Sequence, residues 1–89
     1  MQAQTFPAHV FTVTADAAPG LLPRVLNPFA KRDVMTDAVT AERRGDACHV
    51  TVVCHGLDPV DARLIRADLL RLVGLRTLDV MAEPARLAA

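Results

Sequence analysis

The chain has 89 residues, of which 52% are hydrophobic and 22% charged, and ten basic and ten acidic residues give a formal net charge of zero. This length fits one small domain, which gains stability from association with a partner. The balanced charge and the absence of Trp and Tyr argue against a nucleic-acid-binding protein, which needs basic stripes and aromatic stacking platforms. No apolar stretch has membrane-spanning length and residues 1–8 lack a signal-peptide pattern, so we expect a cytoplasmic protein.

The first half of the chain is predicted to form a strand, a helix and a second strand. Residues 8–14 are β-branched and aromatic, which indicates a strand, and a turn-type cluster at 16–20 follows it. The next apolar residues recur with helical spacing, which predicts a helix that ends near residues 32–33. Residues 34–42 form a weaker strand candidate, and the polar run 43–46 predicts a hairpin connection.

The strand predicted at 47–55 carries both cysteines of the chain. Its alternation places four residues on one face, which we expect to face the core: Cys48, Val50, Val52 and Cys54. Two cysteines six residues apart in one strand cannot bridge, because their Cα atoms lie too far apart for a disulfide. We therefore expect reduced structural cysteines rather than reactive thiols.

The second half ends with a helix and a last strand. Asp58 followed by Pro59 is typical of a helix start, and apolar spacing extends this helix to about residue 73. Residues 75–81 then predict the last strand. This element order predicts an α+β fold, a ferredoxin-like βαββαβ sandwich with a four-stranded antiparallel sheet and two helices on one face.

The two predicted helices carry residues that suggest a family. Six residues directly after a strand resemble the pattern G-x-L-x-R-V-x-x-x-F-x-x-R of ACT domains: Gly20, Leu22, Arg24, Val25, Phe29 and Arg32. Four further residues resemble the L-x-x-L-V-x-V close of the acetolactate synthase regulatory subunits: Leu69, Leu72, Val73 and Leu75. The chain is most similar to the short form of those subunits. We predict a single ACT-like domain at 8–81 between tails at 1–7 and 82–89.

The resemblance implies a non-catalytic subunit without a cofactor of its own. It implies a homodimer that binds and activates a separate thiamine-diphosphate enzyme, the catalytic acetolactate synthase subunit, in branched-chain amino-acid biosynthesis. The sequence shows no nucleophile or acid and base pair that would indicate an enzyme. One alternative is a free-standing ACT-type sensor dimer that binds an amino acid and has no enzyme partner, and another is a small enzyme on the same fold.

Candidate effector-binding residues lie at the turn into the first helix: Asp16, Gly20, Leu21 and Leu22. The unpaired backbone donors of a helix start suit a carboxylate. Gly20 could admit a ligand close to the backbone or could only permit the turn. Asp16 could hold an amino group or could cap the helix. Ala17 and Met35 stand where the family commonly has polar ligand contacts, which argues against inhibition by valine.

Histidines and exposed apolar residues offer weaker candidates. His9, His49 and His55 could approach one another if the first and third strands pair, but the spacing is not that of a metal site, and we expect exposed strand histidines and no bound metal. Val60 and Leu64 on the outer face of the second helix could contact a partner. The sheet face that carries Thr51 and Val53 is better suited to association, because it is broad and partly apolar.

Overall fold

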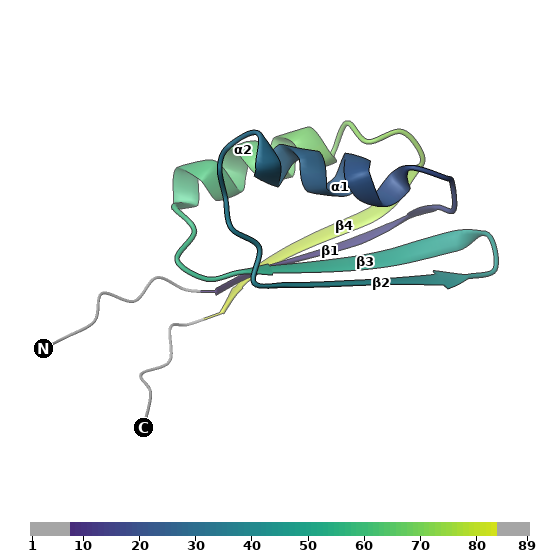
Figure 1. Cartoon of the computed structure of the whole chain (residues 1–89), viewed down its shortest axis with the longest axis horizontal. Coiled ribbons are helices and arrows are strands. Elements are labelled where there is room, and N and C mark those ends of the chain that lie inside the picture. The colour runs from purple at the N-terminus through teal and green to yellow at the C-terminus, as the bar shows by residue number, and fades with distance from the viewer. Residues whose placement is uncertain (1–7, 84–89) are drawn as a thin grey trace, which may run out of the picture.

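The computed structural model describes residues 8–83, so the predicted tail at 1–7 and residues 84–89 lie outside the described residues. The elements in chain order are β1 (Ala8–Asp16), α1 (Leu21–Ala30), β2 (Ala38–Arg44), β3 (Ala47–Cys54), α2 (Pro59–Leu69) and β4 (Leu75–Glu83). The strands form one sheet in the order β2-β3-β1-β4, and all neighbours are antiparallel. Both helices cover the same face of this sheet (Figure 1). The predicted ferredoxin-like fold is confirmed.

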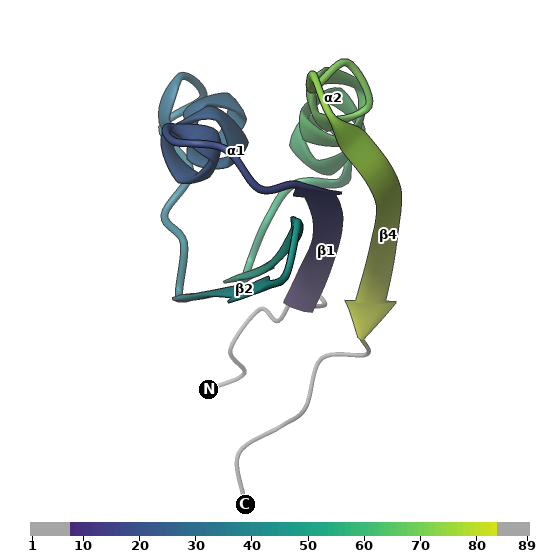
Figure 2. The same ribbon diagram turned by 90° about the vertical axis from the view of Figure 1, so that its right-hand side faces the viewer.

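The core lies between the helix layer and the sheet, and the opposite sheet face is open (Figure 2). Phe11 of β1 and Phe29 of α1 are both buried and meet edge to face, with ring centroids 5.1 Å apart. Every second residue of a strand and every third or fourth residue of a helix joins them, as the predicted periodicities require. The other fully buried large side chains are Val13, Val25, Val50, Val52, Cys54, Ile65 and Leu69.

The helix ends differ from the predicted ends by a few residues. α1 ends at Ala30, and Asp33 then adopts a left-handed conformation with φ of 59°. Asp tolerates this conformation better than most residues, so the turn forms without the usual glycine. α2 ends at Leu69 rather than near residue 73, because Arg71 and Leu72 donate instead to the carbonyls three residues before them. Such bonds tighten the last turn of a helix.

The second strand begins at Ala38, four residues later than predicted. The preceding residues carry the chain from the helix layer to the sheet edge. Asp37 anchors this crossing, since its N–H donates to the Val53 carbonyl at 2.7 Å and its carboxylate accepts from the His55 N–H at 2.6 Å. The bond from His55 lowers the pKa of Asp37. Apolar content alone could not place this boundary, which depends on pairing with β3.

The cysteines and histidines take positions set by strand alternation. Cys54 is buried and Cys48 half-buried on the helix side of the sheet, and both are free thiols, as predicted. His9 is only 6% exposed, so the expectation that the strand histidines are exposed is wrong for this residue. Its position in β1 places it on the covered face, two residues before Phe11. His49 lies on the open face, where its Nδ1 is 3.1 Å from the Thr14 hydroxyl.

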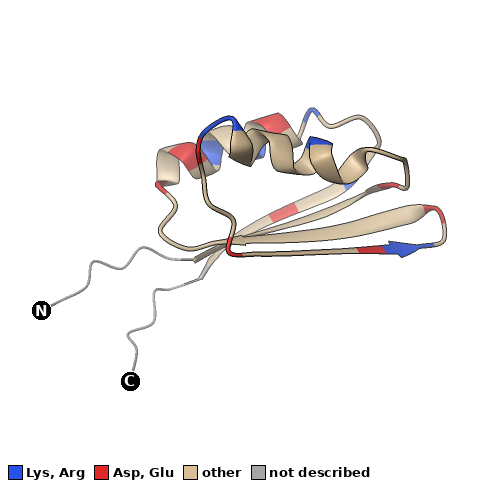
Figure 3. Cartoon of the chain, in the orientation of Figure 1, with Lys and Arg blue, Asp and Glu red and all other residues tan. Residues whose placement is uncertain are grey.

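Charged side chains lie mainly on the helices and around the β2–β3 hairpin, and the strands are largely uncharged (Figure 3). Within residues 8–83, no three His, Cys, Asp or Glu side chains are grouped so that they could hold a metal ion. None of the helices in this part of the chain is long and apolar enough to cross a membrane.

Candidate functional site

The turn from β1 to α1 is held from two sides by backbone hydrogen bonds. The Asp16 N–H donates to the Gly74 carbonyl, and the Ala17 N–H donates to the Asp46 carbonyl, both at 2.9 Å. These bonds fix the turn against the β2–β3 hairpin and against the connection into β4. Gly20 then adopts φ of 80°, a conformation that other residues rarely take. The turn therefore requires this glycine whether or not a ligand approaches it.

Asp16 points away from the start of α1. Its Oδ1 accepts a hydrogen bond from Arg76 Nε at 2.7 Å, and Arg76 Nη2 lies 3.4 Å from Asp46 Oδ1. The bond from Asp16 raises the pKa of Arg76. The N-cap residue of α1 is Gly20 and the helix has no side-chain cap, so the alternative that Asp16 caps α1 is wrong. β1 continues to Asp16, and alternation turns this side chain away from the core.

The two leucines of the predicted site face different surroundings. Leu21 is 4% exposed and packs in the core, and its N–H donates to the Ala18 carbonyl at 3.2 Å. Leu22 is exposed. Within the described chain, the N–H groups of Gly20 and Leu22 have no backbone acceptor. The four predicted residues thus share one turn, but only Gly20 and Leu22 present free backbone donors there.

A cleft of about 430 Å³ lies beside this turn. Its lining comes from the turn, from the end of β2 and from the start of β3: Ala17, Ala18, Pro19, Arg43 and Cys48. Arg43 is the only charged residue of this lining, and no carboxylate in residues 8–83 forms a salt bridge with it. Its Nε donates to the Gly45 carbonyl at 3.0 Å, which holds the guanidinium at the hairpin.

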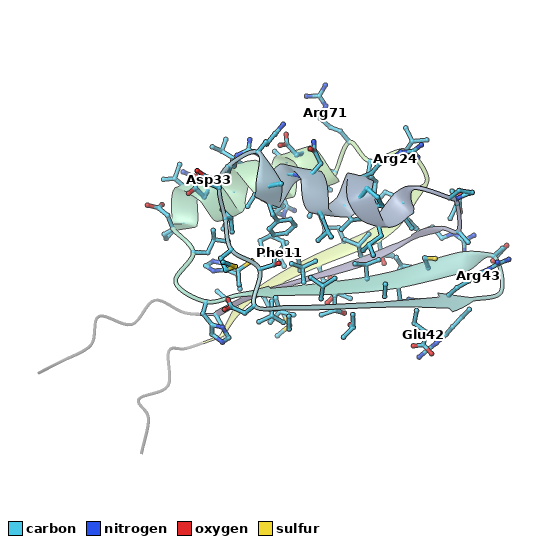
Figure 4. The ribbon with its side chains drawn as sticks, in the orientation of Figure 1. Phe11, Arg24, Asp33, Glu42, Arg43 and Arg71 are labelled. Atoms are coloured by element: carbon cyan, nitrogen blue, oxygen red, sulfur yellow. The ribbon has the colours of Figure 1, made fainter. Side chains whose placement is uncertain are left out.

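Neighbouring charges on β2 point to the other side of the sheet. Glu42 extends away from the helix layer (Figure 4), and its Oε1 accepts from Arg44 Nη2 at 3.0 Å. Alternation along β2 therefore separates Arg43, on the helix side with Cys48, from the ion pair of Glu42 and Arg44. The cleft therefore contains the positive charge of Arg43, which Glu42 does not neutralise.

Arg43 and Cys48 were absent from the predicted site. The polar run 43–46 predicts a hairpin connection that includes Arg43, whereas β2 continues to Arg44 and pairs Arg43 directly with Cys48. Extending the alternation of β3 across the hairpin would have placed both side chains on the same face. The missing information was the length of β2.

Met35, the other position where the family commonly has a polar ligand contact, lies at the opposite end of α1 from Ala17. It is 78% exposed and lines a second cleft of about 400 Å³, together with Ala30, Asp33, Val34 and Thr36. A helix of ten residues spans about 15 Å, so the two positions do not share one cleft within this chain.

Several residues of the first-helix pattern stabilise the fold. Val25 and Phe29 are fully buried. Arg32 Nη1 donates both to the Pro28 carbonyl at 3.2 Å and to Asp68 Oδ2 at 2.7 Å, which joins the end of α1 to α2. Leu22 and Arg24 carry the exposed side chains of the pattern and, with the exposed Gly20, remain available to a ligand or a partner.

Comparisons with known proteins agree with this architecture. A family model for the ACT-like domain matches residues 2–87. Among solved structures, the ACT domain from GTP pyrophosphokinase of Chlorobium tepidum is similar with a TM-score of 0.74 and 9% identity, over 88% of this chain and 100% of that chain. An uncharacterized protein from Thermotoga maritima is similar with a TM-score of 0.70 and 9% identity, over 85% and 95% of the two chains.

The regulatory subunit of aspartate kinase from Thermus thermophilus is similar with a TM-score of 0.64 and 12% identity. The match covers 88% of this chain but 52% of that one, so this chain spans about half of that subunit. A comparison with curated proteins finds no match. Such low identities show a shared fold alone, and the family follows from the match over nearly the whole sequence: the chain belongs to the ACT-like domain family.

Proposed function

We propose that the chain is a non-catalytic regulatory subunit that binds a small effector in the cleft beside the β1–α1 turn. The observation that carries this proposal is the position of the cleft between two connected segments. The Ala17 N–H of the turn bonds to Asp46 of the hairpin, and the cleft is lined from both segments. A ligand there contacts both, and it regulates a partner to the extent that it binds one arrangement of these segments more tightly than another.

The proposed partner is the catalytic subunit of acetolactate synthase, a thiamine-diphosphate enzyme of branched-chain amino-acid biosynthesis. Support comes from the resemblance of the first helix to the small subunits of that enzyme, together with membership of the ACT-like family. Because Val25 and Phe29 are buried, the side chains of the pattern that could contact an enzyme are the exposed ones, Leu22 and Arg24. We expect this surface to take part in docking.

We further propose a homodimer formed through the open face of the sheet. Four apolar residues stand in register across all strands of this face: Ala38, Val53, Val10 and Met81. The exposed fraction of Met81 in this row is 62%. Packing this row against a second copy removes apolar surface from water, which a small domain needs for stability.

The dimer is tested by analytical ultracentrifugation of the full chain and of two lysine variants. Val53→Lys places a charge inside the apolar row and should give a monomer. Val73→Lys places the same charge at an 82% exposed position outside the sheet and should leave the dimer intact. A monomeric wild-type chain, or equal behaviour of the two variants, would contradict dimerisation through this face.

The enzyme partner is tested by measuring acetolactate formation by the catalytic subunit of the same organism, with and without this chain. The proposal expects co-elution of the two chains and a higher rate. Arg24→Ala should weaken the activation, and Arg71→Ala is the matched control, since both arginines project from the helix layer into solvent (Figure 4). Titration with valine, leucine and isoleucine then tests amino-acid regulation. The absence of both co-elution and a change in rate would reject this partner.

A free-standing ACT-type sensor dimer is the second candidate. The observation that favours it is the cleft beside the β1–α1 turn, because its whole lining comes from this chain and a ligand could bind there without an enzyme partner. Saturable ligand binding by the chain, without any effect on acetolactate synthase, would select this candidate over the first.

A further inference from the structure

We propose that the cleft beside Arg43 binds a small aliphatic carboxylate without an ammonium group, such as a 2-oxo acid, in preference to an amino acid. This inference rests on the proposed function of the cleft as an effector site. It names the chemical class of the effector, which the fold and the family leave open.

A carboxylate in this cleft would meet the guanidinium of Arg43. Arg43 Nε is occupied by the Gly45 carbonyl at 3.0 Å, which leaves the two Nη groups for a ligand. No salt bridge within residues 8–83 neutralises Arg43. A guanidinium presents donors in a plane that matches the two oxygens of a carboxylate. The cleft therefore favours an anionic group at this position.

The ammonium group of an amino acid would find no counter-ion in the lining of this cleft. An amino acid carries an ammonium that needs a carboxylate or several acceptors when it leaves water. The two carboxylates nearest the turn, Asp16 and Asp46, both face Arg76, at 2.7 Å and 3.4 Å respectively. Neither lines the cleft. The ammonium of an amino acid would thus lie near the uncompensated charge of Arg43 without a counter-ion of its own.

The rest of the cleft lining carries no charge. Apart from Arg43, the lining consists of Ala17, Ala18, Pro19 and the half-buried Cys48. These groups suit a short aliphatic chain, and about 430 Å³ is within the usual size of a small-ligand site. One cation on an apolar surface matches a ligand with one carboxylate and an aliphatic remainder.

The experiment compares two probes that differ only at the α-carbon, L-valine and 2-oxoisovalerate. Each is titrated into the isotope-labelled full chain and followed by amide chemical shifts. We expect 2-oxoisovalerate to bind about tenfold more tightly or better, because the ammonium of valine loses hydration without gaining a partner. The shifted amides should be those of Ala17, Ala18 and Cys48. Equal or tighter binding of valine, or binding of neither probe, would overturn the inference.

Two variants test the role of Arg43. Arg43→Gln should weaken binding of 2-oxoisovalerate about tenfold, since it removes a charged partner of the carboxylate. Arg44→Gln makes the same change of charge at the neighbouring residue, on the opposite face of β2, and should bind like wild type. Alkylation of Cys48 gives a second measurement, and 2-oxoisovalerate should slow it in wild type but not in Arg43→Gln. Equal effects of the two variants would reject Arg43 as the carboxylate partner.

These results separate the inference from the proposed function. Tighter binding of valine in the cleft would leave an effector site of the opposite class, so only the inference would fail. Binding of the 2-oxo acid without any effect on acetolactate synthase would retain the ligand class and remove the enzyme partner.

Discussion

Arg32 and Asp68 join the two helices through a hydrogen-bonded ion pair, with Arg32 Nη1 2.7 Å from Asp68 Oδ2. Lys31 Nζ lies 3.0 Å from the same oxygen, so one carboxylate holds two cations that follow α1. Asp68 is partly shielded, with 23% of its side chain exposed. The bond from Arg32, followed by that from Lys31, lowers the pKa of Asp68 below its ordinary value of 3.8.

This lowered pKa predicts a pH-dependent contribution to stability. The charged form of Asp68 is favoured in the folded state, so its contribution is present above pH 3.8 and is lost as the pH falls through the folded-state pKa. Asp68→Asn should therefore lower the melting temperature at neutral pH, and the difference from wild type should shrink below pH 3.8. Asp79→Asn, on the open face, is the control and should change little. A difference for Asp68→Asn that persists undiminished in acid would contradict the ion-pair account.

Replacing Gly74 by alanine should lower the free energy of unfolding for two reasons, one steric and one conformational. Its φ is +85°, and a Cβ there would lie 3.3 Å from the Cβ of Asp16. Gly45 also has a positive φ, of +62°, but a Cβ there meets nothing within 4 Å. Gly45→Ala should cost about 1 kcal/mol of unfolding free energy from the backbone conformation, and Gly74→Ala should cost more because of the added contact. Chemical denaturation measures both, and equal costs would show that Asp16 moves aside freely.

The start of α2 gives a third prediction. Asp58 Oδ1 accepts from the Val60 N–H at 2.7 Å, whereas Asp16 caps no helix. Asp58→Ala should cost about 1 kcal/mol, because it leaves a helix donor without its partner. Asp16→Ala removes only an exposed ion pair with Arg76 and should cost less. The two free energies of unfolding test this order, and a larger loss for Asp16→Ala would assign it a structural role beyond that pair.

The order and type of the elements could be predicted because the signals were local. Strand alternation around Val50 and Val52 and the pair Asp58 and Pro59 depend only on neighbouring residues, and each appears where the sequence placed it. The same alternation also accounts for the burial of His9. It lies two residues before the core residue Phe11 in one strand, so its side chain lies on the covered face.

The cleft could not be predicted from local signals, because it depends on pairing between distant segments. The partner of Asp16 is Arg76, sixty residues later, and the two meet only through the antiparallel pairing of β1 with β4. The pairing of Arg43 with Cys48 likewise depends on the true length of β2. Register between strands, rather than the residues of one strand, decides which charges face a ligand.

The two cysteines should differ in reactivity because they differ in burial. Burial, followed by the charge of Asp37, raises the pKa of Cys54 from 9.0 to about 11, which lowers its thiolate fraction at mildly alkaline pH by about a hundredfold. Cys54 is also inaccessible, whereas Cys48 is half-buried at the cleft. In the variant Cys48→Ala, the remaining thiol should react with a disulfide reagent only on unfolding, and in Cys54→Ala it should react in the native state. Matching native rates in the two variants would mean that the sheet opens at Cys54 often enough to admit the reagent, which the packing of Cys54 in the core does not predict.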